Sequence, residues 1–163
     1  MKLIRFFLNI TYKFTQTCGN LASYFFLILI SLVTISVLLR YLFSIGFTWL
    51  QDLYIWTHAI VILLGISYTL KEDGHVRIDL IYRNLSNRKK KIINRIGTIL
   101  FGLPFSYFVF FKGFQYFFRS YQLGESSKET GGLPAIYILK FFICFLGIAL
   151  FLEFLRLIFT KKE

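Results

Sequence analysis

The residues that could bind a metal or a haem are few in this sequence. His58 and His75 are its two histidines, and two histidines on helices could ligate one haem iron. Both belong to the same apolar segment or its end, and the 17 residues that separate them span roughly 25 Å of helix. One chain cannot bring both to a single iron. We therefore interpret His58 as a polar side chain packed against a neighbouring helix and His75 as a hydrated surface residue.

The other reactive residue types form no recognisable catalytic site. The sequence contains no pair of acidic residues spaced for acid–base chemistry, no glycine-rich phosphate loop and no nucleophile with an evident base. Its two cysteines, Cys18 and Cys144, fall at different depths along the helices expected below, so we expect no disulfide between them. The sequence predicts a chain that is not an enzyme and that carries no cofactor or metal.

Several charged side chains lie inside or beside apolar segments, where charge is costly. Four basic residues lie toward one and the same side of the membrane: Arg40, Lys112, Arg119 and Lys140. The acidic ones on that side are Asp52, Glu125 and Glu129. We interpret Lys112 and Lys140 as long side chains that reach the lipid headgroups, and an alternative is that they contact a partner protein.

Two ion pairs are suggested by spacing alone. Arg40 and Asp52 flank a very short turn, so a pair between them would hold the first hairpin together. Glu153 lies deep in the last apolar segment, and Arg156 follows three residues later, which is the spacing of neighbours on one helix face. A local pair accounts for both charges.

The elements that must position these residues are four apolar segments. A helix needs about 20 mostly apolar residues to cross a bilayer. We expect helices at residues 19–43, 49–71, 88–118 and 133–159. They contain much Phe but not the small-residue spacing that is typical of tightly packed membrane helices. Pro134 suits the first turn of the last helix. The fold class predicted is an all-α integral membrane protein, with one domain over residues 1–163.

The composition excludes several other classes of protein. Apolar residues make up 56% of the 163 residues and aromatic residues 20%, which is too apolar for a disordered chain and more than a soluble domain of this size could bury. The formal charge of +11 raises nucleic acid as a partner. Because the charges lie between apolar blocks, we expect anionic membrane lipid as the partner and no nucleic acid.

Lys and Arg counts predict the orientation in the membrane. The N-terminal segment, the segment after the second span and the C-terminal end together hold 14 of the 19 basic residues. Both termini and the 72–87 loop should therefore be cytoplasmic. The N-terminal residues 2–17 have apolar residues at helical spacing. They could form an interfacial helix or a plain extension of the first span, and the sequence does not separate these two interpretations.

The loop after the second span has two further features. Residues 75–85 form a second possible interfacial helix, in which Asp79 and Arg83 could pair. Ser86 suits the N-cap of the third helix. The basic run 88–91 fits an anchor against anionic lipid.

Four short motifs occur in a characteristic order relative to the spans. They are LRYLF at 39–43, WLQDL at 49–53, GHVRIDL at 74–80, and the set formed by Glu125-Ser126, GGLP at 131–134 and Lys140. With four spans and inward termini, they resemble the small membrane subunit of tripartite ATP-independent periplasmic (TRAP) transporters, the DctQ-like family, over about residues 20–160. One departure is Gln51, where many members of that family have an acidic residue.

The resemblance implies a function in transport. The small subunit of such a transporter is a stationary scaffold in the bacterial inner membrane, beside a large DctM-like subunit that binds sodium and substrate and moves as an elevator. A periplasmic binding protein delivers the substrate, often an organic acid, and docks on the outer faces of both. The residues we expect to serve structure or partner contact are Arg40, Trp49, Asp52, His75, Arg119, Glu125, Pro134 and Lys140.

Two other functions stay open from the residues themselves. A membrane-anchor subunit of a redox enzyme would need a haem or quinone site, which the spacing of the histidines disfavours. A small channel or holin-like oligomer would need a polar face along one span, which the sequence does not display. Within the transporter interpretation, we expect Arg40, Trp49 and Asp52 to organise the outer end of the first hairpin and the 119–132 loop to touch the binding protein.

Overall fold

The computed structural model describes residues 2–74 and 85–160. Over these two stretches the chain is helical, with no strand. The helices in chain order are α1 (Lys2–Phe43), α2 (Thr48–Lys71), α4 (Asn87–Gly97), the π-helix η1 (Thr98–Gly102), α5 (Leu103–Gln122) and α6 (Tyr137–Phe159). Because α4, η1 and α5 follow one another without a break, they form a single composite helix over Asn87–Gln122.

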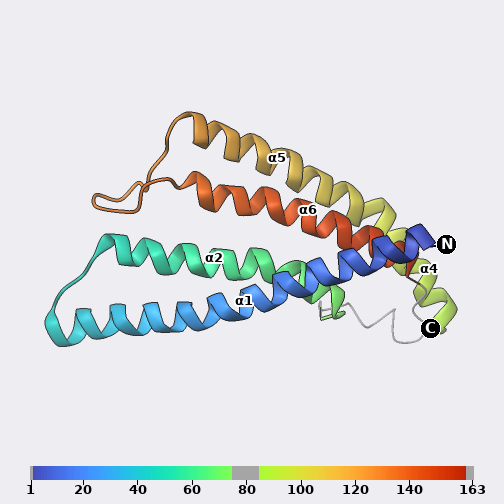
Figure 1. The fold of residues 1–163 in the computed structure, drawn as a ribbon, viewed down its shortest axis with the longest axis horizontal. Helices are drawn as coiled ribbons and strands as arrows, with labels where there is room; N and C mark the ends of the chain where they lie inside the picture. Colours follow the sequence, from blue (N-terminus) through green and yellow to red (C-terminus); the bar gives the residue numbers. More distant parts are fainter. Residues whose placement is uncertain (1, 75–84, 161–163) are drawn as a thin grey trace.

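The described part of the chain has four helices that are long and apolar enough to cross a membrane: α1, α2, the composite helix and α6. This confirms the all-α membrane fold expected from the sequence. The start of α1 and the end of α6 lie at one end of the molecule, together with α4, and the turns at 44–47 and 123–136 lie at the other (Figure 1). Following the charge distribution, we name these the inner end and the outer end.

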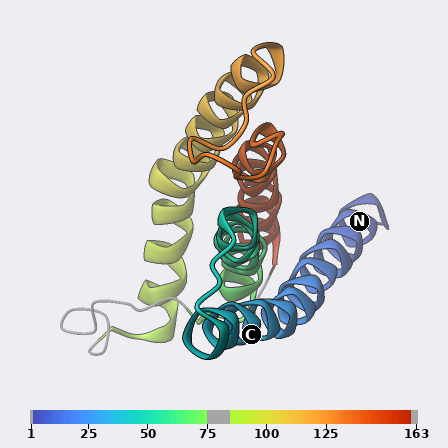
Figure 2. The same cartoon turned by 90° about the vertical axis from the view of Figure 1, so that its left-hand side faces the viewer.

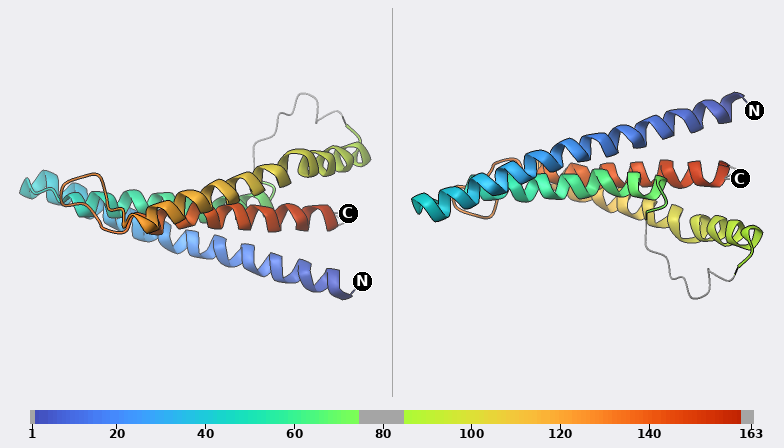
Figure 3. Two further views of the ribbon diagram at one scale, coloured as in Figure 1. Left: turned by 90° about the horizontal axis from the view of Figure 1, so that it is seen from above. Right: turned by 90° about the horizontal axis from the view of Figure 1, so that it is seen from below.

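The helices stand in a row rather than around a common centre. Contacts join α5 to α6, α6 to α2 and α2 to α1, with a smaller contact between α1 and α6. Seen end-on in Figure 2, α5 and α1 lie at opposite ends of this row. Toward the inner end, α1 and the composite helix diverge from α6, as both views of Figure 3 show. The row therefore opens at its inner end.

The first helix is much longer than one membrane span. It runs for 42 residues without interruption. At about 1.5 Å per residue it is roughly 63 Å long, about twice the hydrocarbon thickness of a bilayer. The N-terminal residues therefore extend the first span, and they do not form a separate interfacial helix. The expected start at residue 19 is too late because the polar residues before it interrupt the apolar run but not the helix.

The composite helix also exceeds its expected range of 88–118. Ser86 is its N-cap residue by backbone conformation (φ −63°, ψ 152°), but its side chain makes no capping hydrogen bond. At the other end the helix continues to Gln122, so that Arg119 and Ser120 are helical rather than part of the loop. Polar residues beyond the apolar run do not end a helix, which is why hydropathy alone places this end too early.

The last helix begins later than expected. Pro134 was assigned by its type to the first turn, but α6 starts at Tyr137. The reason is Ala135, whose φ of +64° is in the left-handed region and cannot belong to a right-handed helix. Pro134 is therefore a loop residue, and it is exposed.

The packing of the described helices is the reverse of that in a soluble bundle. Large apolar side chains such as Phe101, Phe105 and Phe108 face outward. The fully buried positions include small or polar residues: Thr11, Thr15, Ser67, Ser106, Ser120 and Glu153. A lipid solvent gives no hydrophobic drive for burying Phe, so helices approach through small and hydrogen-bonding side chains instead. This arrangement fits a protein that is surrounded by membrane.

A seam of small residues joins α5 to α6, contrary to our expectation from the sequence. The buried small residues along this side of the composite helix are Gly102, Ser106, Gly113 and Ser120. A Cβ at Gly113 would lie 2.9 Å from the backbone nitrogen of Cys144, and one at Gly147 would overlap the backbone of Phe110. Each glycine thus allows the backbone of the neighbouring helix to approach closely. The spacing of these small residues is difficult to recognise in the sequence because Phe residues separate them.

Candidate functional site

Three of the expected residues, Asp52, Glu125 and Lys140, lie at the outer end together with Ser120 and Leu133. We name these five residues the outer cluster. Asp52 lies in the second turn of α2 and is only 8% exposed. Its Oδ2 accepts a hydrogen bond of 2.8 Å from the backbone N–H of Leu133. This bond ties the first hairpin to the loop that connects α5 and α6.

The second part of the outer cluster is an ion pair. Lys140 Nζ donates to Glu125 Oε2, and the Ser120 hydroxyl donates to the same oxygen. The lysine also stands over the ring of Tyr116, 3.9 Å from its centroid. The hydrogen bonds from Lys140 and then Ser120 lower the pKa of Glu125 below its ordinary value. Lys140 therefore does not extend to the headgroups as expected, because a carboxylate in the same hairpin satisfies it.

The loop backbone closes around this pair. The N–H of Ile136 donates to the carbonyl of Glu125 over 3.0 Å, and the N–H of Ser127 donates to the carbonyl of Leu133 over 2.9 Å. Gly131 has a φ of +78°, which glycine adopts without strain. A Cβ at Gly132 would overlap the Asp52 carboxylate. The two glycines of the GGLP motif are thus required by the turn and by the approach of Asp52.

The expected pair between Arg40 and Asp52 does not form. Arg40 is exposed at the end of α1, and it takes part in no ion pair among the residues that the structure describes. Asp52 points instead to the loop of the other hairpin, where a backbone N–H is available to it. Trp49 is 45% exposed and packs against Phe47, with 5.7 Å between the ring centroids.

The remaining expected residues are not members of the outer cluster. Arg119 is exposed near the end of α5, beside Ser120, and its charge contributes to the lowered pKa of Glu125. Lys112 is exposed on the same helix. His58 is exposed on α2, which is not the packed position that we expected. His75 lies outside the described residues, as does most of the possible interfacial helix at 75–85. Among the described residues, no three His, Cys, Asp or Glu side chains are grouped so that they could hold a metal ion.

A second polar group lies in the inner half of the row, and we name it the inner cluster: Thr15, Gln16, Lys71, Glu153 and Arg156. Glu153 is fully buried. Arg156 Nε lies 2.9 Å from its Oε1, which confirms the local pair expected from their spacing. Thr15 on α1 donates to Glu153 Oε2 over 3.2 Å. The pair on α6 is therefore also the attachment point of the long first helix.

Lys71, at the end of α2, completes the inner cluster and contacts α1 next to Thr15, at Gln16. It is 5% exposed, donates to the side-chain oxygen of Gln16 and lies 4.5 Å from the ring centroids of both Tyr12 and Tyr68. From its place in the sequence, Lys71 is expected only to add to the basic residues of the inner loop. The one local signal of this contact is Tyr68, which precedes Lys71 by three residues and so lies on the same face of α2.

The two clusters contain carboxylates, two lysines and an arginine, yet each carboxylate already has its partners. Among the described residues, no buried side-chain nitrogen or oxygen lacks a hydrogen-bond partner. Both clusters join separate helices. Their chemistry is that of fixed structural contacts between hairpins.

Comparison with protein families matches residues 29–160 to "Tripartite ATP-independent periplasmic transporters, DctQ component". The chain belongs to the DctQ family. The match begins in the middle of α1 and extends past α6, so it includes both hairpins and the outer cluster. Comparisons with curated proteins and with solved structures found no match.

Membership in the DctQ family confirms the resemblance seen in the sequence. It identifies the chain as a small membrane component of a TRAP transporter, with four helices fit to cross the membrane. The family is a transport component and not a known enzyme family. Residues 2–28 precede the match in this DctQ protein, and they are helical as the first part of α1.

Proposed function

We propose that this DctQ protein is the stationary scaffold of a sodium-coupled TRAP transporter in a bacterial inner membrane. The observation that carries the proposal is the linkage of its helices at both ends. Asp52 joins α2 to the α5–α6 loop at the outer end, and Glu153 joins α6 to α1 in the inner half. A row of helices held in this way is suited to resist the movement of a neighbour.

The partner in this proposal is a large DctM-like subunit that contains the sodium and substrate sites and moves as an elevator. The described helices expose wide aromatic faces, above all on the composite helix, where Phe101, Phe105 and Tyr107 are exposed. Such faces fit either acyl chains or the surface of a second membrane protein. Sodium and the organic-acid substrate are assigned to the partner, and this chain is assigned no cofactor.

A second part of the proposal concerns the periplasmic binding protein. Exposed residues lie near the outer cluster, among them Arg119 at the end of α5 and Ser126 and Lys128 in the α5–α6 loop. The outer cluster holds this loop in one conformation through Glu125 and Leu133. A loop ordered in advance binds with a smaller loss of conformational freedom. We assign the docking of the binding protein to these exposed residues.

The scaffold role is tested by uptake and by isolation of the complex. Membrane vesicles that lack only this chain should lose sodium-driven uptake of the substrate, and a tagged chain isolated in mild detergent should bring a large polytopic subunit with it. Full uptake without the chain would contradict the proposal. Isolation with haem-containing subunits, together with a Soret band in the visible spectrum, would favour the redox-anchor alternative.

The docking role needs a separate test, because a scaffold could serve without it. A photo-crosslinking residue at Ser126 or Lys128 should capture the binding protein during turnover. The same residue at Arg88, which is exposed in α4 at the inner end, is the matched control and should not. Crosslinks that never reach the binding protein from the outer loop would remove the docking assignment and leave the scaffold role intact.

A further inference from the structure

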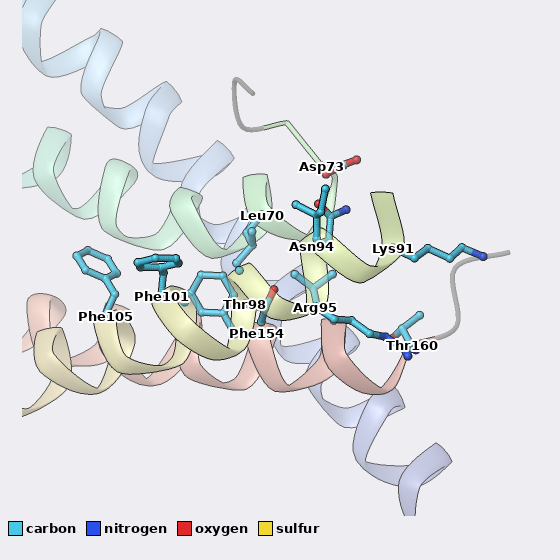
Figure 4. A pocket seen from close by; sticks show the side chains of 14 residues that line it. Leu70, Asp73, Lys91, Asn94, Arg95, Thr98, Phe101, Phe105, Phe154 and Thr160 are labelled. Atoms are coloured by element: carbon cyan, nitrogen blue, oxygen red, sulfur yellow. The ribbon is translucent and has the colours of Figure 1, made fainter. Parts of the chain in front are cut away.

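A cavity of about 720 Å³ lies at the inner end, between the end of α2, the α4–η1–α5 helix and the last turns of α6. Figure 4 shows it from close by. Its volume is within the range of roughly 300–1,000 Å³ that small-molecule sites have. Neither polar cluster described above takes part in it, and nothing in the DctQ assignment accounts for it.

The two ends of the cavity differ in chemistry. Phe101, Phe105 and Phe154 gather at one end, deeper along the helices (Figure 4). Lys91 and Arg95 belong to the other end, where Arg95 runs toward Thr160. Among the described residues that line the cavity, Asp73 is acidic, and Lys91 and Arg95 are basic. The described lining is therefore apolar at depth and has two cationic side chains at its mouth.

The local backbone explains why this space exists. The π-helix η1 widens the composite helix over Thr98–Gly102, and π-turns within α-helices are often found at functional sites. Gly97, directly before it, lacks a side chain on the cavity wall, and a Cβ there would meet no atom within 4 Å. The next glycine, Gly102, packs closely on the ring of Phe154, 2.9 Å from a hypothetical Cβ. Gly97 thus leaves space in the wall of the cavity. Gly102 allows the ring of Phe154 to pack against η1 at the bottom of the cavity.

The cavity also lies at a defined depth in the membrane. Its cationic mouth is on α4, whose basic run carries the densest positive charge of the chain, and its aromatic end lies where the composite helix enters its apolar span. Basic residues at this position face the anionic headgroups of the cytoplasmic leaflet. A ligand that fits must be anionic at the level of the headgroups and apolar below them.

We propose that the cavity binds one anionic phospholipid of the inner leaflet. Its phosphate lies between Lys91 and Arg95, and the beginning of one acyl chain lies against Phe101, Phe105 and Phe154. A free phosphate would use the mouth but leave the aromatic end unfilled. A lipid with an anionic headgroup, such as phosphatidylglycerol, supplies a phosphate for the two cationic side chains and an acyl chain for the aromatic rings.

Native mass spectrometry of the purified full chain in mild detergent tests this. The chain is mixed with equal amounts of phosphatidylglycerol and phosphatidylcholine that have the same acyl chains. We expect one phosphatidylglycerol to be retained in preference to phosphatidylcholine. The variant R95Q should reduce its retention about fivefold, as expected for a headgroup contact of roughly 1 kcal/mol. The variant G97L should reduce retention, because its side chain projects from the cavity wall into space that the lipid would occupy.

Two matched controls separate the cavity from general surface effects. K89Q removes the same charge from an exposed position of α4 that does not line the cavity, and it should retain the lipid. G65L adds the same side chain at a helical glycine of α2 that also has open space around it, and it should behave as the unaltered chain. Circular dichroism verifies that G97L keeps its helices, which a leucine in place of a helical glycine should favour.

Four results would overturn the proposal. Equal retention of the two lipids would remove the headgroup preference. Equal losses in R95Q and K89Q would reduce the effect to surface charge. Undiminished binding in folded G97L would show that the acyl chain does not enter the cavity. Displacement of the lipid by inorganic phosphate alone would assign the site to a free anion instead.

Discussion

Asp52 and Leu133 are 81 positions apart in the sequence, and the carboxylate of one accepts a 2.8 Å hydrogen bond from the backbone N–H of the other. Because Asp52 is buried, this bond is shielded from competing water. It is the contact through which the first hairpin and the α5–α6 loop determine each other's position.

Removal of this carboxylate should loosen the outer end. A hydrogen bond to a charged group contributes about 1.5–3 kcal/mol, so D52A should lower the thermal unfolding midpoint of the full chain in detergent. Q51A, which alters an exposed neighbour, is the control and should not. Within the transporter, the charge reversal D52K should lower assembly or uptake. An unchanged midpoint and normal assembly would refute the role given to this contact.

Gly147 should tolerate no side chain. A Cβ there would overlap the backbone of Phe110, so G147L must push α5 away from α6 and separate the seam. Overpacking of this kind typically costs about 1–3 kcal/mol, and a lower unfolding midpoint should report it. G65L has open space at the added Cβ and serves as the control. A G147L protein as stable as G65L would mean that α5 and α6 are not in close contact.

The ion pair of the outer cluster should respond to acid in a defined direction. Lys140 and Ser120 lower the pKa of Glu125 from its ordinary value of 4.5. The stabilisation is therefore fully present above that value and is lost as the pH falls through the lower pKa of the folded protein. The difference in unfolding midpoint between the unaltered chain and E125Q should be constant at neutral and mildly acidic pH and should vanish on stronger acidification.

Glu129 provides the control for this titration. It lies in the same loop and is exposed, so E129Q should change the midpoint little at any pH. A loss of the Glu125 contribution already near neutral pH would contradict the sign of the shift.

The buried pair of the inner cluster should be sensitive to single but not to double replacement. E153L leaves Arg156 without its carboxylate, and removing one partner of a buried pair costs about 3–5 kcal/mol. Replacing both, as in E153L/R156M, removes both buried charges and should recover most of the loss. Unfolding of the three proteins in the same detergent measures this. A double variant as unstable as E153L would indicate that Thr15 and Glu153, rather than the ion pair, hold α1.

The spans and the local pair Glu153–Arg156 can be predicted from sequence, for one reason. A membrane span and an i,i+3 neighbour are both properties of a short stretch of chain. The partner of Asp52 is not such a property. Arg40 is nearer in the sequence, but the choice between it and Leu133 depends on how two hairpins pack, and no local pattern contains that information.

Helix ends and close packing were harder to predict for related reasons. Pro134 has the residue type of a first turn, yet the backbone of Ala135 delays α6 to Tyr137. The seam through Gly113 becomes visible only when the composite helix is laid against α6, because hydropathy registers the Phe residues around it and not the gaps between them.

The arrangement of the helices in a row has a consequence for the shape of the transporter in the plane of the membrane. A closed bundle of four helices would present a compact round outline, whereas a row presents two broad sides and two narrow edges (Figure 2). A neighbour seated along one broad side leaves lipid on the other. A complex lengthened in this way rotates more slowly about the membrane normal, and tips less readily about its short in-plane axis, than a round body does.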